Sequence, residues 1–175
     1  MLKRLAAVRW RRLLLEALLV FAVIVGVQLY QSRGLPEGAA PALEGNLANG
    51  STTSLAEVLR QAGGKPVLVA FWATWCPVCK AEEGNLAAIA RDTPFIGVAM
   101  QSGDAVAVAR HLKDRGLDFS SIPDPAGVLA AQWRVRGVPT HFIVDGQGQV
   151  RFREVGYVTT LGLRARLWWA QRFPA

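Results

Sequence analysis

The chain has 175 residues, of which 51% are hydrophobic and 19% are charged, and its formal net charge is +7 at pH 7. Residues 1–33 carry six basic side chains and one acid, a net charge of +5, whereas the remainder carries 14 basic and 12 acidic side chains. The positive charge is therefore concentrated at the N-terminus, and the folded part lacks the clustered Lys and Arg of a nucleic-acid-binding face. The length suits one domain with an appendage.

The N-terminal region predicts a membrane anchor. A basic segment, residues 1–12, precedes the apolar segment Leu13–Tyr30, which contains one acid, Glu16. Its length is about that needed to cross a bilayer core, and no small-residue cleavage site follows it closely, so we predict an uncleaved anchor rather than a signal peptide. The positive-inside rule then keeps the N-terminus in the cytoplasm. In a bacterium, this predicts a single span in the inner membrane with the rest of the chain in the periplasm, where disulfides persist.

The segment after the anchor predicts a linker and the start of a domain. Residues 31–44 are rich in Gly, Pro and Ala, so we expect a linker there and a folded domain over 45–175. Ser54 and Glu57 have capping-box spacing, which predicts a short helix, and Asn49-Gly50 predicts a turn before it. The apolar pattern then predicts a strand over 67–72, a helix from the cysteines to Ala90, a strand over 95–100 and a helix ending at Arg115.

The C-terminal half predicts a hairpin between helices. Residues 117–127 are expected to form a loop, because two prolines interrupt them, and residues 128–135 a short helix. Segments 140–144 and 149–155 alternate between apolar and polar residues and predict a β-hairpin, and 160–172 predicts an amphipathic helix. The order β-α-β-α-(α)-β-β-α predicts an α/β fold with a mixed central sheet flanked by helices on both faces.

Both cysteines of the chain lie in one motif, Cys76-Pro77-Val78-Cys79, where the strand over 67–72 gives way to a helix. A sulfur at a helix N-terminus faces unpaired amides and the positive end of the helix dipole, which favours a thiolate at Cys76. Cys79 lies one turn later, close enough to form a disulfide with Cys76. The C-x-x-C spacing beside a βαβ pattern predicts a redox-active pair.

Two other interpretations of the cysteines are weaker. A structural zinc site would need both cysteines together with His111 and His141, but 29 residues separate the histidines, far from the usual spacing. A purely structural disulfide would close a very short loop and would constrain the unfolded chain little. We therefore expect no metal and no cofactor other than the redox-active disulfide Cys76–Cys79.

Three features resemble the thioredoxin superfamily: the stretch Val67–Glu83 (VLVAFWATWCPVCKAEE), the stretch Gly137–Asp145 (GVPTHFIVD), and the order of elements between them. The resemblance covers about residues 45–172 and implies a thioredoxin fold. The FWATWCxxCKxE form resembles the membrane-tethered periplasmic branch, which includes TlpA-like proteins, the cytochrome c maturation thioredoxins and the suppressor of copper sensitivity protein D group. The dipeptide Pro77-Val78 favours the last of these groups.

The resemblance implies roles for individual residues. Cys76 matches the exposed nucleophilic cysteine, and Cys79 matches the resolving cysteine. Val138 and Pro139 match a loop whose proline is cis and lies against the cysteines, where the Val138 backbone can pair with a substrate segment. Trp75 is expected to border the substrate-binding face.

The residues around the cysteines predict how their chemistry is tuned. The position of a buried aspartate in thioredoxin is occupied by Ala70, so another proton acceptor is needed. Glu82 follows Cys79 by three residues and lies on the same side of the helix, which suits redox tuning or proton relay. The alternative is a solvated surface acid, as we expect for Glu83. Pro77 lacks an N–H and Val78 lacks a charge, so neither strengthens the stabilisation of a thiolate.

The two histidines are weaker candidates for a part in this chemistry. His141 is interpreted as lying on a strand, although it follows the Pro139 loop by two positions and could face the cysteines. His111 lies in a polar helix and is interpreted as a surface residue.

The resemblance implies a membrane-anchored thiol–disulfide oxidoreductase that reduces disulfides in partner proteins. A reductase in the periplasm must be recharged, so a membrane electron donor of the thiol-transporting type is the implied partner. A disulfide-forming oxidase on the same fold remains an alternative. A copper-binding metal chaperone is an alternative of another class, although copper carriers of this fold have three residues between the cysteines, and this chain has two.

Overall fold

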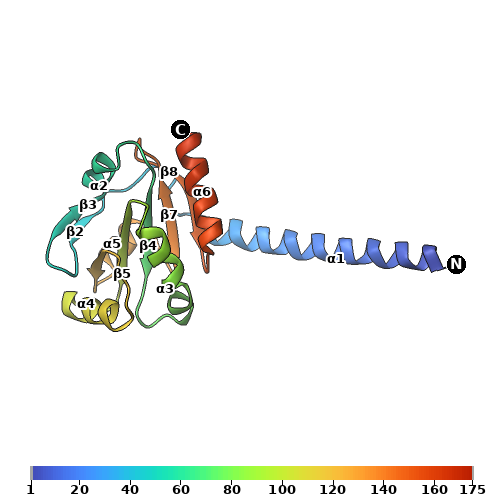
Figure 1. Cartoon of the computed structure of the whole chain (residues 1–175), viewed down its shortest axis with the longest axis horizontal. Coiled ribbons are helices and arrows are strands. Elements are labelled where there is room, and N and C mark those ends of the chain that lie inside the picture. The colour runs from blue at the N-terminus through green and yellow to red at the C-terminus, as the bar shows by residue number, and fades with distance from the viewer. Residues whose placement is uncertain (1, 175) are drawn as a thin grey trace. The chain divides into compact units, whose positions relative to one another are not determined.

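The computed structural model describes residues 2–174, apart from the side chains of residues 2–9, 11, 24 and 29. The outer ends of the predicted basic segment and of the predicted domain, residues 1 and 175, lie outside the described residues, as do most side chains of the basic segment. The chain divides after Arg33 into two units, and the first contains a single helix, α1 (Leu2–Gln31) (Figure 1). Among the described residues, no helix combines the length and the apolar character that a membrane crossing requires.

The second unit is built on a mixed six-stranded sheet with the order β1-β8-β7-β4-β5-β6 (Figure 1). Strand β4 pairs in parallel with β5, and β5 with β6, whereas β7 runs antiparallel to both β4 and β8. The strands are β1 (Gly38–Ala39), β4 (Val67–Trp72), β5 (Phe95–Met100), β6 (Ser121–Asp124), β7 (Thr140–Val144) and β8 (Gln149–Val155). A separate hairpin is formed by β2 (Glu44–Asn46) and β3 (Thr52–Ser54).

Helices cover both faces of the sheet, as predicted. They are α2 (Leu55–Gln61), α3 (Pro77–Ala90), α4 (Ala105–Asp114), α5 (Val128–Gln132) and α6 (Thr160–Arg172). Leu68, Ala70 and Trp72 of β4 pack in one core with residues of α3, α4 and α6, and the alternate residues of β4 pack in a second core with α5. Strand β4 is therefore buried on both faces, and its carboxyl end leads directly to the cysteines.

Most elements predicted from the sequence are confirmed. Strands β4, β5, β7 and β8 and helices α3 and α6 have the predicted bounds. Ser54 caps α2, and its side chain accepts a hydrogen bond from the Glu57 amide, as the capping box predicts. The predicted turn at Asn49-Gly50 lies between β2 and β3.

The prediction of a linker over residues 31–44 is wrong for most of its length. Gly38 and Ala39 form β1, which pairs with β8 at one edge of the sheet. Leu35 and Leu43 are buried in the core, so the folded unit begins at Gly34. A two-residue strand of small residues has no alternation from which it could be predicted.

The prediction of a loop over residues 117–127 is wrong in its centre, where residues 121–124 form β6. This strand lies at the other edge of the sheet and pairs only with β5. Pro123 has no N–H to donate, and an edge strand tolerates it because one side of the strand has no partner in the sheet. The proline that suggested a loop is thus accommodated by the position of the strand.

Candidate active site

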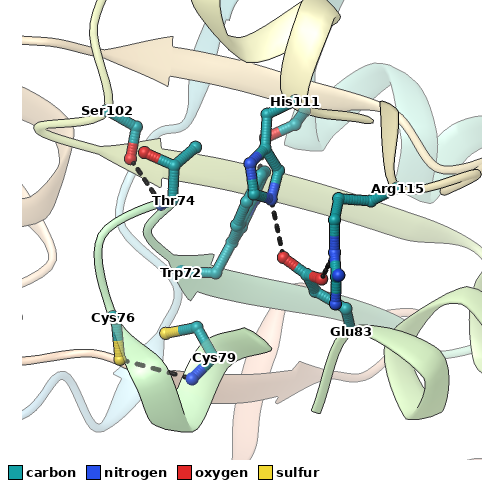
Figure 2. Close-up of polar contacts among 9 residues, drawn as sticks. Trp72, Thr74, Cys76, Cys79, Glu83, Ser102, His111 and Arg115 are labelled. Atoms are coloured by element: carbon teal, nitrogen blue, oxygen red, sulfur yellow. Dashed lines mark hydrogen bonds and ion pairs between the residues drawn. The ribbon is translucent and has the colours of Figure 1, made fainter. Parts of the chain in front are cut away.

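The first turn of α3 holds the sulfur of Cys76 against the helix backbone. Cys76 is the N-cap residue with extended dihedral angles, and its Sγ accepts a hydrogen bond from the amide of Cys79 at 3.3 Å (Figure 2). Pro77 occupies the first helical position, where a missing N–H costs nothing because that amide has no partner within the helix. The amide contact and the helix dipole both favour negative charge on this sulfur.

The two cysteines are free thiols in different environments. Cys79 is 1% exposed, and burial raises the pKa of its thiol, with the hydrogen bond to the Cys76 sulfur and the charge of Glu82 adding to the effect. Cys76 is 5% exposed, so the expectation of an exposed thiol at Cys76 is wrong in degree. Its neighbours Trp75, Pro77 and Val78 are exposed and form the surface around it.

The loop before β7 lies against the cysteine pair. The Val138–Pro139 peptide bond is cis, which is the isomer that the resemblance implies. The Cys76 thiol donates to the carbonyl oxygen of Val138 at 3.5 Å, although the two residues are 62 positions apart. The Thr140 hydroxyl donates to the carbonyl of Gly137 at 2.8 Å and closes the loop. The fold thus brings together the two motifs on which the resemblance depends.

The two tryptophans before the cysteines point in different directions. Trp72 is buried in the core, as expected, and its Nε1 donates to the Ser121 hydroxyl at 3.0 Å. Trp75 is 53% exposed, and its Nε1 donates to the carbonyl of Gln101 at 3.1 Å, which fixes the ring at the surface. The Thr74 amide also donates to the hydroxyl of Ser102, so the segment before Cys76 is tied to the loop after β5 (Figure 2).

Glu82 and His141 form a fully buried pair behind Cys79. Their exposed fractions are 0% and 1%, and Glu82 Oε1 lies 2.9 Å from His141 Nε2. This is ion-pair distance, but the angles do not make a hydrogen bond, and none of the pair's four polar side-chain atoms has a hydrogen-bond partner among the described residues. The interpretation of Glu82 as a solvated surface acid is therefore wrong.

His141 lies on β7, as expected, but its contact with Glu82 was not predicted from the sequence. The register pairs His141 with Ala70 of β4, so a methyl group lies opposite the imidazole, at the position for which the resemblance implies a buried aspartate in thioredoxin. The small side chain of Ala70, opposite a histidine on the facing strand, is the signal that could have revealed this pair once the strands were aligned.

Glu83, the next residue of α3, makes a second buried cluster, and the interpretation of Glu83 and His111 as surface residues is wrong. Glu83 is 2% exposed, its Oε1 lies 2.7 Å from His111 Nε2, and its Oε2 accepts from Arg115 Nε at 2.9 Å (Figure 2). The His111 ring lies 5.5 Å from the Trp72 ring, measured between centroids. In the part of the chain that is described, no group of three or more His, Cys, Asp and Glu side chains could hold a metal ion.

Comparisons with known proteins agree with this fold and motif. Residues 36–153 match the AhpC/TSA family. The chain is 33% identical over 174 residues to the thiol:disulfide interchange protein DsbE of Escherichia coli K12, a match that covers 90% of each chain. It is 39% identical over 101 residues to a DsbE homolog of Paracoccus denitrificans, a match that covers 57% of this chain and 55% of that protein.

A solved structure shows the same fold. The thiol:disulfide interchange protein, thioredoxin family protein, from Chlorobium tepidum TLS superimposes with a TM-score of 0.65 at 24% sequence identity. The superposition covers 78% of this chain and 97% of that protein. The predicted thioredoxin fold is confirmed by this likeness.

Proposed function

Because this chain belongs to the AhpC/TSA family, in the cytochrome c maturation branch of the thioredoxin superfamily, we propose that it is a membrane-anchored periplasmic thiol–disulfide oxidoreductase that reduces disulfides in partner proteins. The activity itself is that of thiol–disulfide exchange, as the names of its relatives state for those proteins. The direction, the anchor and the roles of individual residues are our proposal. The preference for the copper-sensitivity group, drawn from Pro77-Val78, is overturned by this assignment, because the relatives reported above are DsbE proteins.

The reaction consists of two exchange steps. The Cys76 thiolate attacks one sulfur of a substrate disulfide, an S–S bond forms between Cys76 and the substrate, and the other substrate sulfur leaves with the electron pair. Cys79 then loses its proton and attacks the Cys76 sulfur, which releases the second substrate sulfur as a thiolate. The protein ends with a Cys76–Cys79 disulfide, and two electrons have passed to the substrate.

The observation that carries this proposal is the contrast between the two thiols. The Cys76 sulfur lies against the amide of Cys79 at the start of a helix, which favours its ionised form. Burial raises the pKa of Cys79, so that thiol keeps its proton until the mixed disulfide has formed. The contrast supports Cys76 as the attacking cysteine and Cys79 as the resolving one.

A buried thiol with a raised pKa needs a proton acceptor before it can attack. We assign this role to Glu82, which is buried one turn after Cys79 on the same helix. Pro77 and Val78 affect the reduction potential of the Cys76–Cys79 pair, because neither adds a hydrogen-bond donor or a charge that would stabilise the Cys76 thiolate.

The substrate-binding surface is assigned to the exposed ring of Trp75 and to the loop of Val138 and Pro139. Val138 is half-buried, and its carbonyl is close enough to accept from the Cys76 thiol. An extended substrate segment can pair with this backbone as a short β-bridge, which would align its disulfide with Cys76.

The cellular setting follows from the charge pattern. The basic segment before Leu13–Tyr30 supports a cytoplasmic N-terminus, an inner-membrane anchor at that segment and a periplasmic catalytic domain. An electron donor in the same membrane, of the thiol-transporting type, would return the Cys76–Cys79 disulfide to the dithiol.

Single cysteine variants test the proposal. Cys76→Ser should abolish insulin reduction by the full-length protein, because the first attack is lost. Cys79→Ser should instead accumulate mixed disulfides with substrate proteins, visible on non-reducing gels and released by dithiothreitol. If Cys79→Ser captures nothing while Cys76→Ser does, the order of attack is reversed; if neither captures substrate and the wild type does not reduce insulin, the proposed activity is wrong.

A further inference from the structure

We propose that His141 is a positioning residue that supplies the positive counter-charge of Glu82. It thereby keeps the Glu82 carboxylate ionised inside the protein and ready to take the proton of Cys79. This inference rests on the function proposed above and adds to it a residue that the redox motif does not contain.

The geometry isolates Glu82 and His141 from other partners. The 2.9 Å separation of Oε1 and Nε2 is the only short polar contact described for either side chain, and all four of their polar atoms lack hydrogen bonds within the described residues. Because both side chains are almost completely buried, solvent does not stabilise a charge on either one. A carboxyl group in such a place keeps its proton unless a cation lies beside it.

The other charged groups on this face leave His141 as the counter-charge of Glu82. Strand β8 places Glu154 opposite His141, but Glu154 accepts a hydrogen bond from Arg166 of α6 at 2.7 Å and is already paired. Strand β4 contributes only apolar side chains, and α3 contributes Cys79.

A proton transfer from Cys79 conserves charge in this arrangement. Before the transfer, Glu82 is negative, His141 is positive and the Cys79 thiol is neutral. Afterwards the Glu82 carboxyl is neutral and the Cys79 thiolate is balanced by the same imidazolium, so no net charge is created in the interior. The thiolate then attacks the Cys76–substrate disulfide, the substrate sulfur leaves with the electron pair, and the proton on Glu82 returns to solvent or to the departing thiolate.

The inference is tested by His141→Gln in the full-length protein. Glutamine can place an N–H near the position of Nε2 but never carries the charge. A stopped-flow measurement follows release of a fluorescent peptide from its mixed disulfide with Cys76. We expect release at pH 7 to slow about tenfold or more, and the pH of half-maximal rate to rise by about one unit or more, because no cation then stabilises the buried carboxylate that accepts the proton.

The matched control is His111→Gln, since the Nε2 of His111 also faces a glutamate, at 2.7 Å from Glu83 Oε1. We expect this variant to keep the release rate and its pH midpoint unchanged within about twofold. If His141→Gln also keeps the wild-type rate and midpoint, the inference is overturned; mixed disulfides still captured by Cys79→Ser would show that the proposed function survives.

A second measurement needs no variant. The ¹⁵N chemical shifts of the His141 ring, recorded on the dithiol form of the wild type at pH 7, should be those of an imidazolium. A neutral imidazole in this state would overturn the inference even if His141→Gln failed to fold.

Discussion

Two consecutive glutamates of α3 each meet one of the chain's two histidines, and they differ in how completely their polar atoms are hydrogen-bonded. Glu83 uses one oxygen for His111 and the other for Arg115, at 2.7 and 2.9 Å. Glu82 approaches His141 at 2.9 Å, but neither side chain makes a hydrogen bond within the described residues. Both glutamates are buried, so exposure does not explain the difference.

The comparison separates a structural pair from a reactive one. A buried carboxylate with both oxygens bonded contributes to stability and has little tendency to exchange a proton. A buried pair without hydrogen bonds is unfavourable for stability, and such pairs in native proteins are often found where chemistry requires them. Glu82, which we propose takes the proton of Cys79, belongs to such a pair, whereas Glu83 points toward His111 and Arg115 (Figure 2).

The largest expected effect is the difference in substrate release between Glu82→Gln and Glu83→Gln. Glu82→Gln should slow the Cys79-dependent release of substrate about 100-fold at pH 7, because the acceptor of the Cys79 proton is lost. Glu83→Gln should leave this rate within about twofold of the wild type, because Glu83 takes no part in proton transfer. Stopped-flow release assays on both variants make the comparison. An equal loss of release rate in the two variants would show that Glu82 and Glu83 do not differ in function.

The next effect is on stability, and here Glu83 should dominate. Glu83→Ala should lower the free energy of unfolding by about 2 kcal/mol, because His111 and Arg115 lose a charged acceptor and a small cavity forms. Urea denaturation with an unchanged m-value would measure the loss, and Glu83→Gln, which retains one acceptor oxygen, should lose less. A wild-type midpoint for Glu83→Ala would show that the cluster contributes nothing.

The difference between the two glutamates could not be predicted from the sequence. Helical spacing places Glu82 on the side of Cys79, but it does not say which strand residue lies opposite. The contact with His141 depends on the register that sets Ala70 beside His141, and the contact of Glu83 depends on how α4 packs on α3. Both are consequences of tertiary packing between segments far apart in the chain.

The fold was easier to predict from the sequence than these contacts. The apolar run over residues 67–72 and the capping serine Ser54 are local signals, and each produced a correct prediction. The strands β1 and β6 were missed because one is too short to alternate and the other contains a proline at a sheet edge. The proximity of Cys76 to Val138 came from the resemblance and not from the pattern of residues.

A smaller effect should have the opposite sign. Replacing both members of the unbonded pair, as Glu82→Leu with His141→Leu, should raise the free energy of unfolding by about 1 kcal/mol, because apolar side chains remove four buried polar atoms that make no hydrogen bonds. The same variant should release substrate as slowly as Glu82→Gln. Urea denaturation beside the release assay tests both, and a less stable double variant would mean that the pair is held by interactions stronger than its geometry indicates.

The smallest effect is expected at the edge of the bonded cluster. Arg115 donates to Glu83 at 2.9 Å, but its side chain is 51% exposed, so water replaces most of what the contact provides. Arg115→Ala should therefore lower the free energy of unfolding by less than about 1 kcal/mol, and the loss should shrink as salt is raised. Urea titrations at low and high ionic strength measure it, with Glu83→Ala as the reference. A loss as large as that of Glu83→Ala would transfer the main role in this cluster from the buried His111 contact to Arg115.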